Sequence, residues 1–253
     1  MRNIKVSVAY DGTDFVGWQN QATGRSVQGV LEAALAKIHK HPVTIYGAGR
    51  TDSGVHAAGQ VFNFYSDIAA IPEERYAPAL NRLLPSDVRA LCSGGVEETF
   101  NSRRDARFRE YRYYIYPGRP LPPWLRRYCW DRAAGGLRRM NAMAAFLPGR
   151  RDFTSFAAVG DTNPAKVKDV YSAGFYPSGP FIVFRITGNA FLWRMVRNIV
   201  GTITELAGDG AAPEVFRDIL AAKKSLHAGM TAPARGLFLH KVLYGGDAQA
   251  AVY

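Results

Sequence analysis

The carboxylate of Asp52 is the first candidate for chemistry, because it lies in a short glycine-containing segment close to an arginine and a histidine. The stretch reads GAGRTDSGVHAAGQ, Gly47 to Gln60, with Arg50 two residues before the aspartate and His56 four residues after it. Asp-Ser-Gly is favourable turn chemistry, so a turn role explains the aspartate on its own. A cation two residues away along an extended segment, however, can share a face with the carboxylate and keep it ionised inside a cleft. An ionised carboxylate can act as a nucleophile, which makes Asp52 a candidate catalytic residue.

Other kinds of site fit this segment less well. GAGRTD has an aspartate where a dinucleotide-binding fingerprint has its third glycine, and no Gly-Lys-Ser/Thr follows to form a phosphate-binding loop. His39 and His41 lie near a predicted helix end with surface or turn roles, and the chain shows no cluster of carboxylates that would hold two metals. Ser53 and His56 lack the strand-turn-helix setting of a nucleophilic serine. We therefore expect no metal and no cofactor.

Basic residues are concentrated in the second part of the chain. The protein has 253 residues and a net charge of +11; residues 1 to 100 contain 9 Lys and Arg against 10 Asp and Glu, whereas residues 101 to 253 contain 23 against 11. Thirteen arginines lie between Arg103 and Arg151, among several tyrosines and a phenylalanine. Because arginine suits phosphate and aromatic rings stack on bases, this pattern favours nucleic-acid contact over a merely solvated basic face.

The composition also limits the compartment. Cys92 and Cys129 are the only cysteines, too few for a zinc cluster, and the first ten residues do not resemble a signal peptide. No apolar run approaches the roughly 20 residues that span a bilayer. We therefore expect a cytoplasmic protein without a membrane role.

Hydrophobic periodicity predicts the elements that position the Asp52 segment. Alternation indicates strands and three- and four-residue spacing indicates helices. In order, the first half is predicted to contain a strand at 4–10, a helix at 27–38 capped by Ser26, strands at 42–47 and 60–66, a helix at 73–84 and a strand at 87–95. This order is β-α-β-β-α-β.

The same order is predicted for the second half. Its elements are a strand at 107–118, a helix at 136–149, strands at 168–178 and 180–188, a long helix at 192–206, a further short helix at 213–223 and a last strand at 236–245. Gly201, inside the long helix, costs about 1 kcal/mol relative to alanine, so we expect a close packing contact there.

Two such units in tandem predict an α+β fold of two ferredoxin-like halves. We expect an N-terminal half at 1–103, which carries the Asp52 segment, and a basic C-terminal half at 104–253. Each half has an antiparallel sheet with helices on one face. The two sheets are expected to join into an extended sheet, with an active-site cleft between the halves.

Several motifs together resemble the tRNA pseudouridine synthase A family. They are AGRTDSGVHAAGQV, preceded by YDGTDFVGWQNQ and SVQGVLEAAL, and followed by NRLLPSDV, FNSRRDARFREYRYYIY, RDFTSFA, GNAFLWRMVRNIVGTI and TAPARGLFLHKVLY. They occur in the family's order and extend from Lys5 to Tyr244. The family has two ferredoxin-like halves sharing an extended sheet, in agreement with the fold predicted above.

The resemblance implies a tRNA pseudouridine synthase that isomerises uridine to pseudouridine at positions 38, 39 and 40 of the anticodon stem and loop. Asp52 matches the family's nucleophile. It can attack ribose C1′, attack C6 of the ring, or assist proton removal from the ribose to give a glycal, and the sequence does not choose among these routes. The resemblance implies no cofactor, and it implies a homodimer that holds one tRNA across both subunits.

Three further residues are implied to bind the substrate. Tyr111 matches the family's active-site tyrosine, whose ring can stack on the extruded uracil. Arg50 matches the arginine that helps to extrude the base, and Arg197 is placed to be the ion-pair partner of Asp52. These two roles can be exchanged, and a purely structural role for Arg197 is nearly as good an interpretation. His56 is expected to hold the loop.

One departure and two alternatives remain. Family members often have His-Ala-Arg where this chain has Asn101, Ser102 and Arg103, a difference that we expect to affect RNA contact more than chemistry. The first alternative is a noncatalytic tandem RNA-binding protein, although the aromatic signature of RNA-recognition modules is absent from both halves. The second is a phosphodiester nuclease, which would require metal ions.

Overall fold

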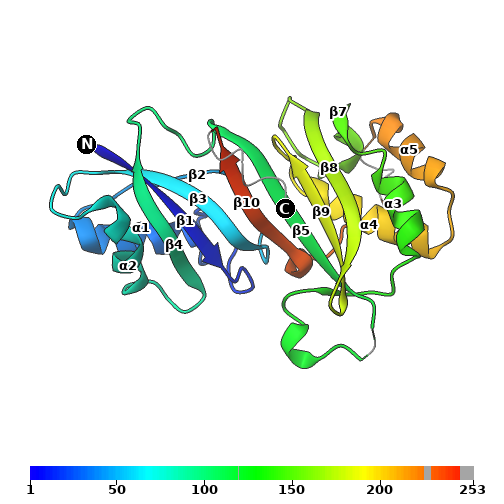
Figure 1. The fold of residues 1–253 in the computed structure, drawn as a ribbon, viewed down its shortest axis with the longest axis horizontal. Coiled ribbons are helices and arrows are strands. Elements are labelled where there is room, and N and C mark those ends of the chain that lie inside the picture. The colour runs from blue at the N-terminus through cyan, green and yellow to red at the C-terminus, as the bar shows by residue number, and fades with distance from the viewer. Residues whose placement is uncertain (119, 225–228, 246–253) are drawn as a thin grey trace. The chain divides into compact units, whose positions relative to one another are not determined.

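The computed structural model describes residues 1–118, 120–224 and 229–245, and these form two compact units. The first unit comprises Met1–Arg107 together with the described residues from Phe238 onward. The second unit comprises Phe108–Leu237. The predicted boundary between 103 and 104 thus lies four residues before the one in the structure. Figure 1 shows both units as mixtures of strands and helices.

The sheet of the first unit is built around β3 (His56–Ser66), the strand that directly follows the Asp52 segment. It is flanked by β1 (Arg2–Tyr10), which pairs with it antiparallel and carries β4 (Val88–Val96) on its other side. The free edge of β3 receives two short pairings. β2 (Tyr46–Gly47) is antiparallel to it at Asn63 and Phe62, and β10 (Leu237–Tyr244) is parallel to it at His56 and Ala57. The last strand, predicted as part of the second half, thus pairs with β3, and Figure 1 shows β10 beside β3.

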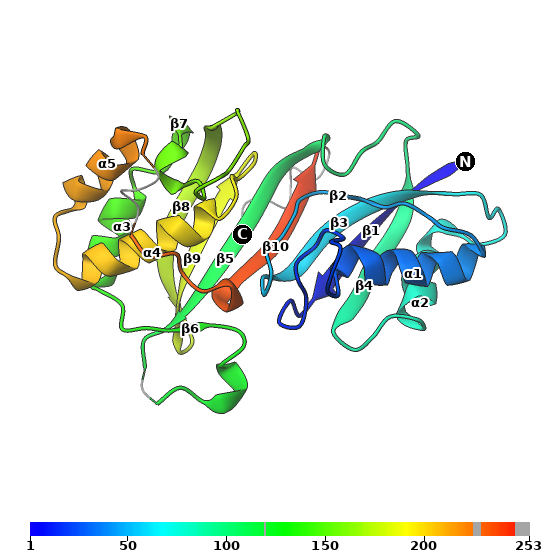
Figure 2. The ribbon, with the colours of Figure 1, turned by 180° about the vertical axis from the view of Figure 1, so that it is seen from behind.

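The helices of the first unit follow the predicted pattern. α1 (Val27–His39) begins after Ser26, whose Oγ accepts a hydrogen bond from the N–H of Gly29 at 3.1 Å, and Figure 2 shows it crossing in front of the strands. α2 (Tyr76–Asn81) is shorter than predicted, because a 3₁₀ turn forms its start. Near the end of the predicted range, Leu83 is 39% exposed and Leu84 is buried.

The sheet of the second unit has the strand order β5-β9-β8-β7. β5 (Ala106–Tyr116) pairs antiparallel with β9 (Phe181–Gly188), which pairs antiparallel with β8 (Val167–Ser178). Hydrophobic periodicity did not predict two short strands. They are β7 (Gly149–Asp152), at the edge of this sheet, and β6 (Trp130–Asp131), which runs parallel to the end of β5. Strands of two to four residues are too short to show an alternating pattern.

Three helices complete the second unit: α3 (Leu137–Ala144), α4 (Met195–Gly208) and α5 (Pro213–Ala222). α4 buries apolar residues at spacings of three and four, and Figure 2 shows it crossing in front of the strands of this unit. They are Met195, Val196, Ile199, Val200 and Ile203. A methyl group added at Gly201 would meet the carbonyl oxygen of Met230 at 1.7 Å, so the predicted close packing contact is confirmed.

The fold class is α+β with a ferredoxin-like arrangement in each unit, as predicted. Both sheets are mainly antiparallel, with the parallel pairings of β10 and β6 as exceptions. The joining of the two sheets and the cleft between the halves stay predictions. Within the described ranges, no helix is both long and apolar enough to cross a membrane.

A buried polar network ties the end of the first unit to its sheet. Asn63 is fully buried; its Nδ2 donates to Oδ1 of Asn3 at 2.9 Å, and its Oδ1 accepts from the N–H and the hydroxyl of Ser102 at 2.9 and 2.8 Å. The hydroxyl of Tyr244 in turn donates to the carbonyl of Ser102 at 2.9 Å. The expectation that this departure from the family pattern affects RNA contact does not fit Ser102, because the residue is buried and holds backbone in place.

Replacing Asn63 by alanine should destabilise the protein by about 2–3 kcal/mol, because the buried N–H and hydroxyl of Ser102 would lose their acceptor. Urea unfolding followed by circular dichroism would measure the change. The matched control is Asn163→Ala, at an exposed turn position, for which less than about 0.5 kcal/mol is expected. Equal effects of the two substitutions would show that the network does not stabilise the fold.

Candidate active site

Asp52 lies in the turn that leads from β2 into β3. The N–H of Ala48 donates to the carbonyl of Val61 at 2.8 Å, which keeps the start of the segment against β3. The N–H of Val55 donates to the carbonyl of Asp52 at 3.1 Å, which closes a tight turn over Asp52, Ser53 and Gly54. Thr51 is buried, Asp52 is half-buried and Ser53 is exposed. The carboxylate is therefore placed at the boundary between the unit's interior and its surface.

The segment that follows β1 holds this turn from the other side. The N–H of Trp18 donates to the carbonyl of Thr51 at 3.0 Å, and the hydroxyl of Ser53 donates to the carbonyl of Phe15 at 3.1 Å. The hydroxyls of Tyr10 and Thr51 lie 2.8 Å apart. The residues on both sides of Asp52 are thus hydrogen-bonded, which fixes the backbone that carries the carboxylate.

Two glycines allow the two backbones to approach this closely. A methyl group on Gly12 would meet the carbonyl oxygen of Val55 at 2.0 Å. One on Gly17 would meet the carbonyl oxygen of Thr51 at 2.7 Å, and Gly17 also has a φ of +114°, which side-chain-bearing residues rarely adopt. These positions therefore require glycine if Asp52 is to stay where it is.

The buried side chain of His56 supports the turn through several contacts. Its side chain is 1% exposed, its Nδ1 accepts a hydrogen bond from the N–H of Gly12 at 3.1 Å, and its ring stacks on that of Phe238 with centroids 4.5 Å apart. Oδ1 of Asp11 lies 3.1 Å from the same nitrogen. These contacts agree with the expectation that His56 holds the loop.

Arg50 lies on the same segment with its side chain exposed. The spacing of two residues was expected to bring its charge to the carboxylate. In the part of the chain that the structure describes, however, no ion pair joins Arg50 to Asp52. The side chain of Arg50 is instead exposed at the surface beside the turn.

Tyr111 and Arg197 belong to the second unit. Tyr111 lies on β5 opposite Ile186, is 8% exposed, and contacts the ring of Phe191 edge-on at a centroid distance of 5.2 Å. Arg197 lies in the first turn of α4, where its Nε donates to the carbonyl of Ala232 at 2.8 Å. This bond fixes the direction of the guanidinium.

Tyr113, on the same face of β5, belongs to the core. It is fully buried and its hydroxyl donates to the carbonyl of Pro233 at 2.8 Å. Burial raises the pKa of its phenol, although the positive charges of Arg197 and Arg235 oppose that shift. Tyr113 therefore remains a neutral hydrogen-bond donor, whereas Tyr111 retains a small accessible surface.

Two arginines near Tyr111 are less available to RNA than their sequence positions suggest. Arg109 is 8% exposed and donates to the carbonyl of Asn189 at 2.5 Å. Nε of Arg112 lies 2.8 Å from Oε1 of Glu110, whose other oxygen lies 3.0 Å from Nε of Arg185. The positive charge of Arg112 is thus partly balanced within the sheet, and exposed arginines elsewhere are better candidates for phosphate contact.

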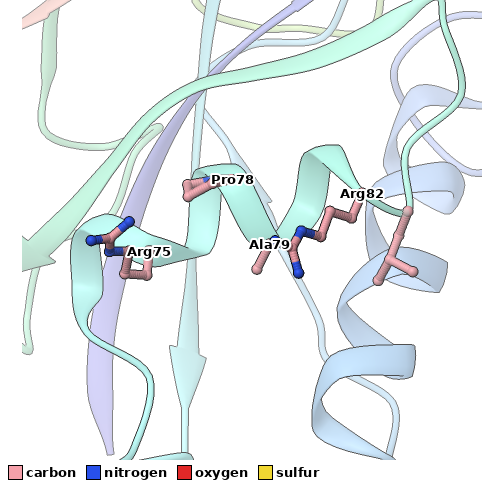
Figure 3. A pocket seen from close by; sticks show the side chains of 5 residues that line it. Arg75, Pro78, Ala79 and Arg82 are labelled. Atoms are coloured by element: carbon pink, nitrogen blue, oxygen red, sulfur yellow. The ribbon is translucent and has the colours of Figure 1, made fainter.

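Two surface hollows, one in each unit, lie away from these residues. One is lined by Arg75, Pro78, Ala79, Arg82 and Leu83 along α2 (Figure 3). Another lies between β7 and α5, with Arg150, Arg217 and Lys223 at its rim. Neither includes any of the four predicted site residues. Among the described residues, no group of three or more histidine, cysteine, aspartate or glutamate side chains is arranged to hold a metal ion.

Comparison with known proteins identifies the family. A family model described as tRNA pseudouridine synthase matches residues 6–98 and 143–245, which is more than half of the chain. The chain belongs to the tRNA pseudouridine synthase family. It is 43% identical over 252 residues to the tRNA pseudouridine synthase A of Treponema denticola, covering 97% of this chain and 94% of that protein. It is also 43% identical over 244 residues to the protein of the same name from Moorella thermoacetica, covering 95% and 99%.

The sequence did not predict which residues support the turn at Asp52. Gly12, Gly17 and Tyr10 lie in the motif YDGTDFVGW, which carried the resemblance without a physical role. A glycine at the end of a predicted strand signals a turn, but its partner lies about 40 residues away in the chain. Only the folded backbone shows which segment comes so close.

Replacing Gly12 by alanine should displace the turn at Asp52, because the added methyl group would overlap backbone rather than a movable side chain. We expect a loss of about 1–3 kcal/mol in the free energy of unfolding and faster hydrogen exchange at the amides of residues 51–55. Hydrogen exchange followed by mass spectrometry measures both. Gly49→Ala is the matched control in the same segment, since a methyl group there meets no atom within 4 Å. If Gly12→Ala exchanged like Gly49→Ala, the close approach would not hold the turn.

Proposed function

We propose that this protein isomerises uridine to pseudouridine in tRNA, with Asp52 as the nucleophile. The observation that carries the proposal is the half-buried carboxylate on a turn whose backbone is fixed on both sides, in a member of the tRNA pseudouridine synthase family. A single well-placed carboxylate is sufficient for nucleophilic catalysis. The enzyme is thus an isomerase of RNA.

The finer features of the proposal come from the resemblance of the sequence motifs. The target uridines are those at positions 38, 39 and 40, in the anticodon stem and loop. The enzyme acts in the cytoplasm as a homodimer. The basic second part of the chain, with 23 Lys and Arg against 11 Asp and Glu after residue 100, supports binding to a polyanion.

The reaction exchanges one glycosidic bond for another. The bond between ribose C1′ and uracil N1 breaks, the ring turns, and a bond forms between C1′ and C5. The hydrogen on C5 is lost as a proton and N1 gains one, so the net reaction needs no oxidant or reductant. Asp52 can form an ester at C1′, add to C6, or take a proton from the ribose; each route requires its carboxylate to be ionised and held in place.

A fixed turn favours catalysis because it holds the nucleophile in position before the reaction. A nucleophile that is already in position avoids the loss of freedom that a mobile group would incur in the transition state. The hydrogen bonds of Thr51 and Ser53 to the segment after β1 supply that restraint on either side of Asp52. The glycines at 12 and 17 make those bonds sterically possible.

Substrate binding must offset the cost of taking the uridine out of its stack, which is a few kcal/mol. We propose that Tyr111 stacks on the extruded base. Arg50, exposed beside Asp52, helps to extrude it, and Arg197 serves as the ion-pair partner of Asp52. The exchange of these two roles remains open. The bond from Arg197 to the carbonyl of Ala232 supports a fixed guanidinium in either role.

Asp52→Asn should reduce turnover by at least about a thousandfold while tRNA affinity stays within a few-fold, because the amide keeps the shape of the side chain and loses its nucleophilicity. Incubation with unmodified tRNA in EDTA, followed by carbodiimide and alkali treatment and primer extension, maps pseudouridine. Wild type should give stops at positions 38–40. The control is Asp209→Asn, an exposed aspartate in the second unit, which should behave as wild type.

The same assay separates the competing functions. Strand scission that EDTA abolishes would indicate a nuclease. Salt-sensitive binding without any pseudouridine would indicate a noncatalytic RNA-binding protein. Pseudouridine in tRNA at other positions would retain the reaction and overturn the proposed target.

Tyr111→Ala should lower kcat/KM by about 10- to 100-fold if its ring stacks on the base, because such stacking is worth roughly 1–3 kcal/mol, whereas Tyr111→Phe should retain most of the activity. Steady-state kinetics on unmodified tRNA would measure both. Tyr113→Phe is the matched comparison: it removes the buried bond to Pro233 and should change stability more than kcat/KM. If Tyr111→Ala affected only stability, Tyr111 would be a core residue.

A further inference from the structure

An arginine-rich segment leaves the sheet of the second unit between β5 and α3. Figure 1 shows it as the green loop with a short helical turn, and Figure 2 shows the same loop extending away from the strands of this unit. At its turn lies Trp124, which is 74% exposed. Exposure to this degree leaves the indole ring accessible to a ligand.

The turn that carries Trp124 is conformationally restricted. Pro122 and Pro123 precede it, and the 3₁₀ turn Pro123–Leu125 is closed by the N–H of Leu125 donating to the carbonyl of Pro122 at 3.0 Å. Sγ of Cys129 donates to the carbonyl of Leu125 at 3.3 Å. Proline rings fix φ, so the backbone under Trp124 has little freedom left to lose when a ligand binds.

The base of the segment is anchored in the core of the second unit. Trp130, in β6, pairs with the end of β5 and contacts Tyr113 edge-on at 6.2 Å between ring centroids. Nε of Arg235 donates to the carbonyl of Cys129 at 3.1 Å. The segment is therefore attached through Tyr113 to the strand that carries Tyr111.

Charge around the exposed ring is positive. Between residues 117 and 136 the sequence contains four arginines and one acidic residue, Asp131. Arg126, two residues after Trp124, is exposed. An exposed aromatic ring flanked by arginines is the combination by which proteins bind unpaired nucleotides: the ring stacks on a base and the guanidinium contacts a phosphate.

We infer that this segment is a second RNA-contacting site, at which Trp124 stacks on an unpaired base of tRNA and Arg126 contacts the backbone phosphate. The inference rests on the proposed function, because it takes tRNA as the ligand, and it adds residues that lie outside the proposed catalytic group. RNA fits better than a second copy of this chain, since two segments with this charge, on proteins of net charge +11, would repel each other.

Equilibrium binding of unmodified tRNA at several salt concentrations tests the inference. Trp124→Ala should weaken binding by about 5- to 100-fold at every salt concentration, with the salt slope unchanged, because stacking involves no counterion release. Trp124→Tyr should restore most of the affinity, as the ring is retained. Arg126→Gln should lower the slope by about 0.7–0.9 log unit per log unit of salt, the value for one lost phosphate contact.

Control variants and outcomes keep this test separate from that of the proposed function. Arg82→Gln, an exposed arginine of the first unit, should leave the slope unchanged. If wild type forms pseudouridine in tRNA while Trp124→Ala binds tRNA as wild type does, the inference fails and the proposed function stands. If wild type neither binds nor modifies tRNA, the proposed function fails.

Sedimentation of the free protein tests whether Trp124 contacts a second protein chain instead of RNA. A change of mass in Trp124→Ala with tRNA affinity unaltered would show that the ring is a protein contact and would overturn the inference. An unchanged mass with weakened binding supports RNA contact. Circular dichroism and urea unfolding should show wild-type stability for Trp124→Ala, because the ring removed is mostly solvent-exposed.

Discussion

The close approach of two backbone segments at Gly12 and Gly17 is the constraint on which the turn that carries Asp52 depends. A single methyl group at either position would overlap the chain that carries Asp52. This close approach lets the two segments hydrogen-bond directly to each other, from Trp18 to Thr51 and from Ser53 to Phe15. The backbone that carries the carboxylate is thus positioned by chain packing.

In the second unit, close backbone approach likewise positions the side chains of Tyr113 and Arg197. The stretch around residues 230–236 passes so close to α4 and β5 that Gly201 and Gly236 have no space for a side chain, the latter because of the ring of Tyr113. Carbonyl groups of the same stretch receive the Tyr113 hydroxyl and the Arg197 guanidinium. One loop that ends in a 3₁₀ turn therefore orients two polar side chains that secondary structure alone would leave free to rotate.

Much of this architecture could be predicted from the sequence because its elements have strong periodicity. The alternation in β1 and the apolar stripe of α4 each report burial on one face, and the Ser26 cap is a local signal. Hydrophobic and polar residues alternate equally well in β10. Alternation does not determine which strand lies next to it, however, so its pairing with β3 was not predicted. For the site, the sequence was sufficient to identify Asp52 as the candidate nucleophile and to identify the loop that carries it. The absence of an ion pair between Arg50 and Asp52, and the pairing of Arg112 with Glu110, depend on side-chain directions that spacing does not determine.

The pairing of β10 with β3 has a consequence for how the protein is made. His56 meets its partner Phe238 only after about 180 further residues have been synthesised, which takes on the order of 10–40 s at ordinary rates of translation. During that interval part of the edge of β3 and one face of the His56 ring lack their cover, in a chain that is still attached to the ribosome. The turn that carries Asp52 would therefore acquire its full set of contacts only after β10 has been made, although it is encoded early. Until then, the uncovered strand edge would be exposed to pairing with other chains and would be a natural site for a chaperone.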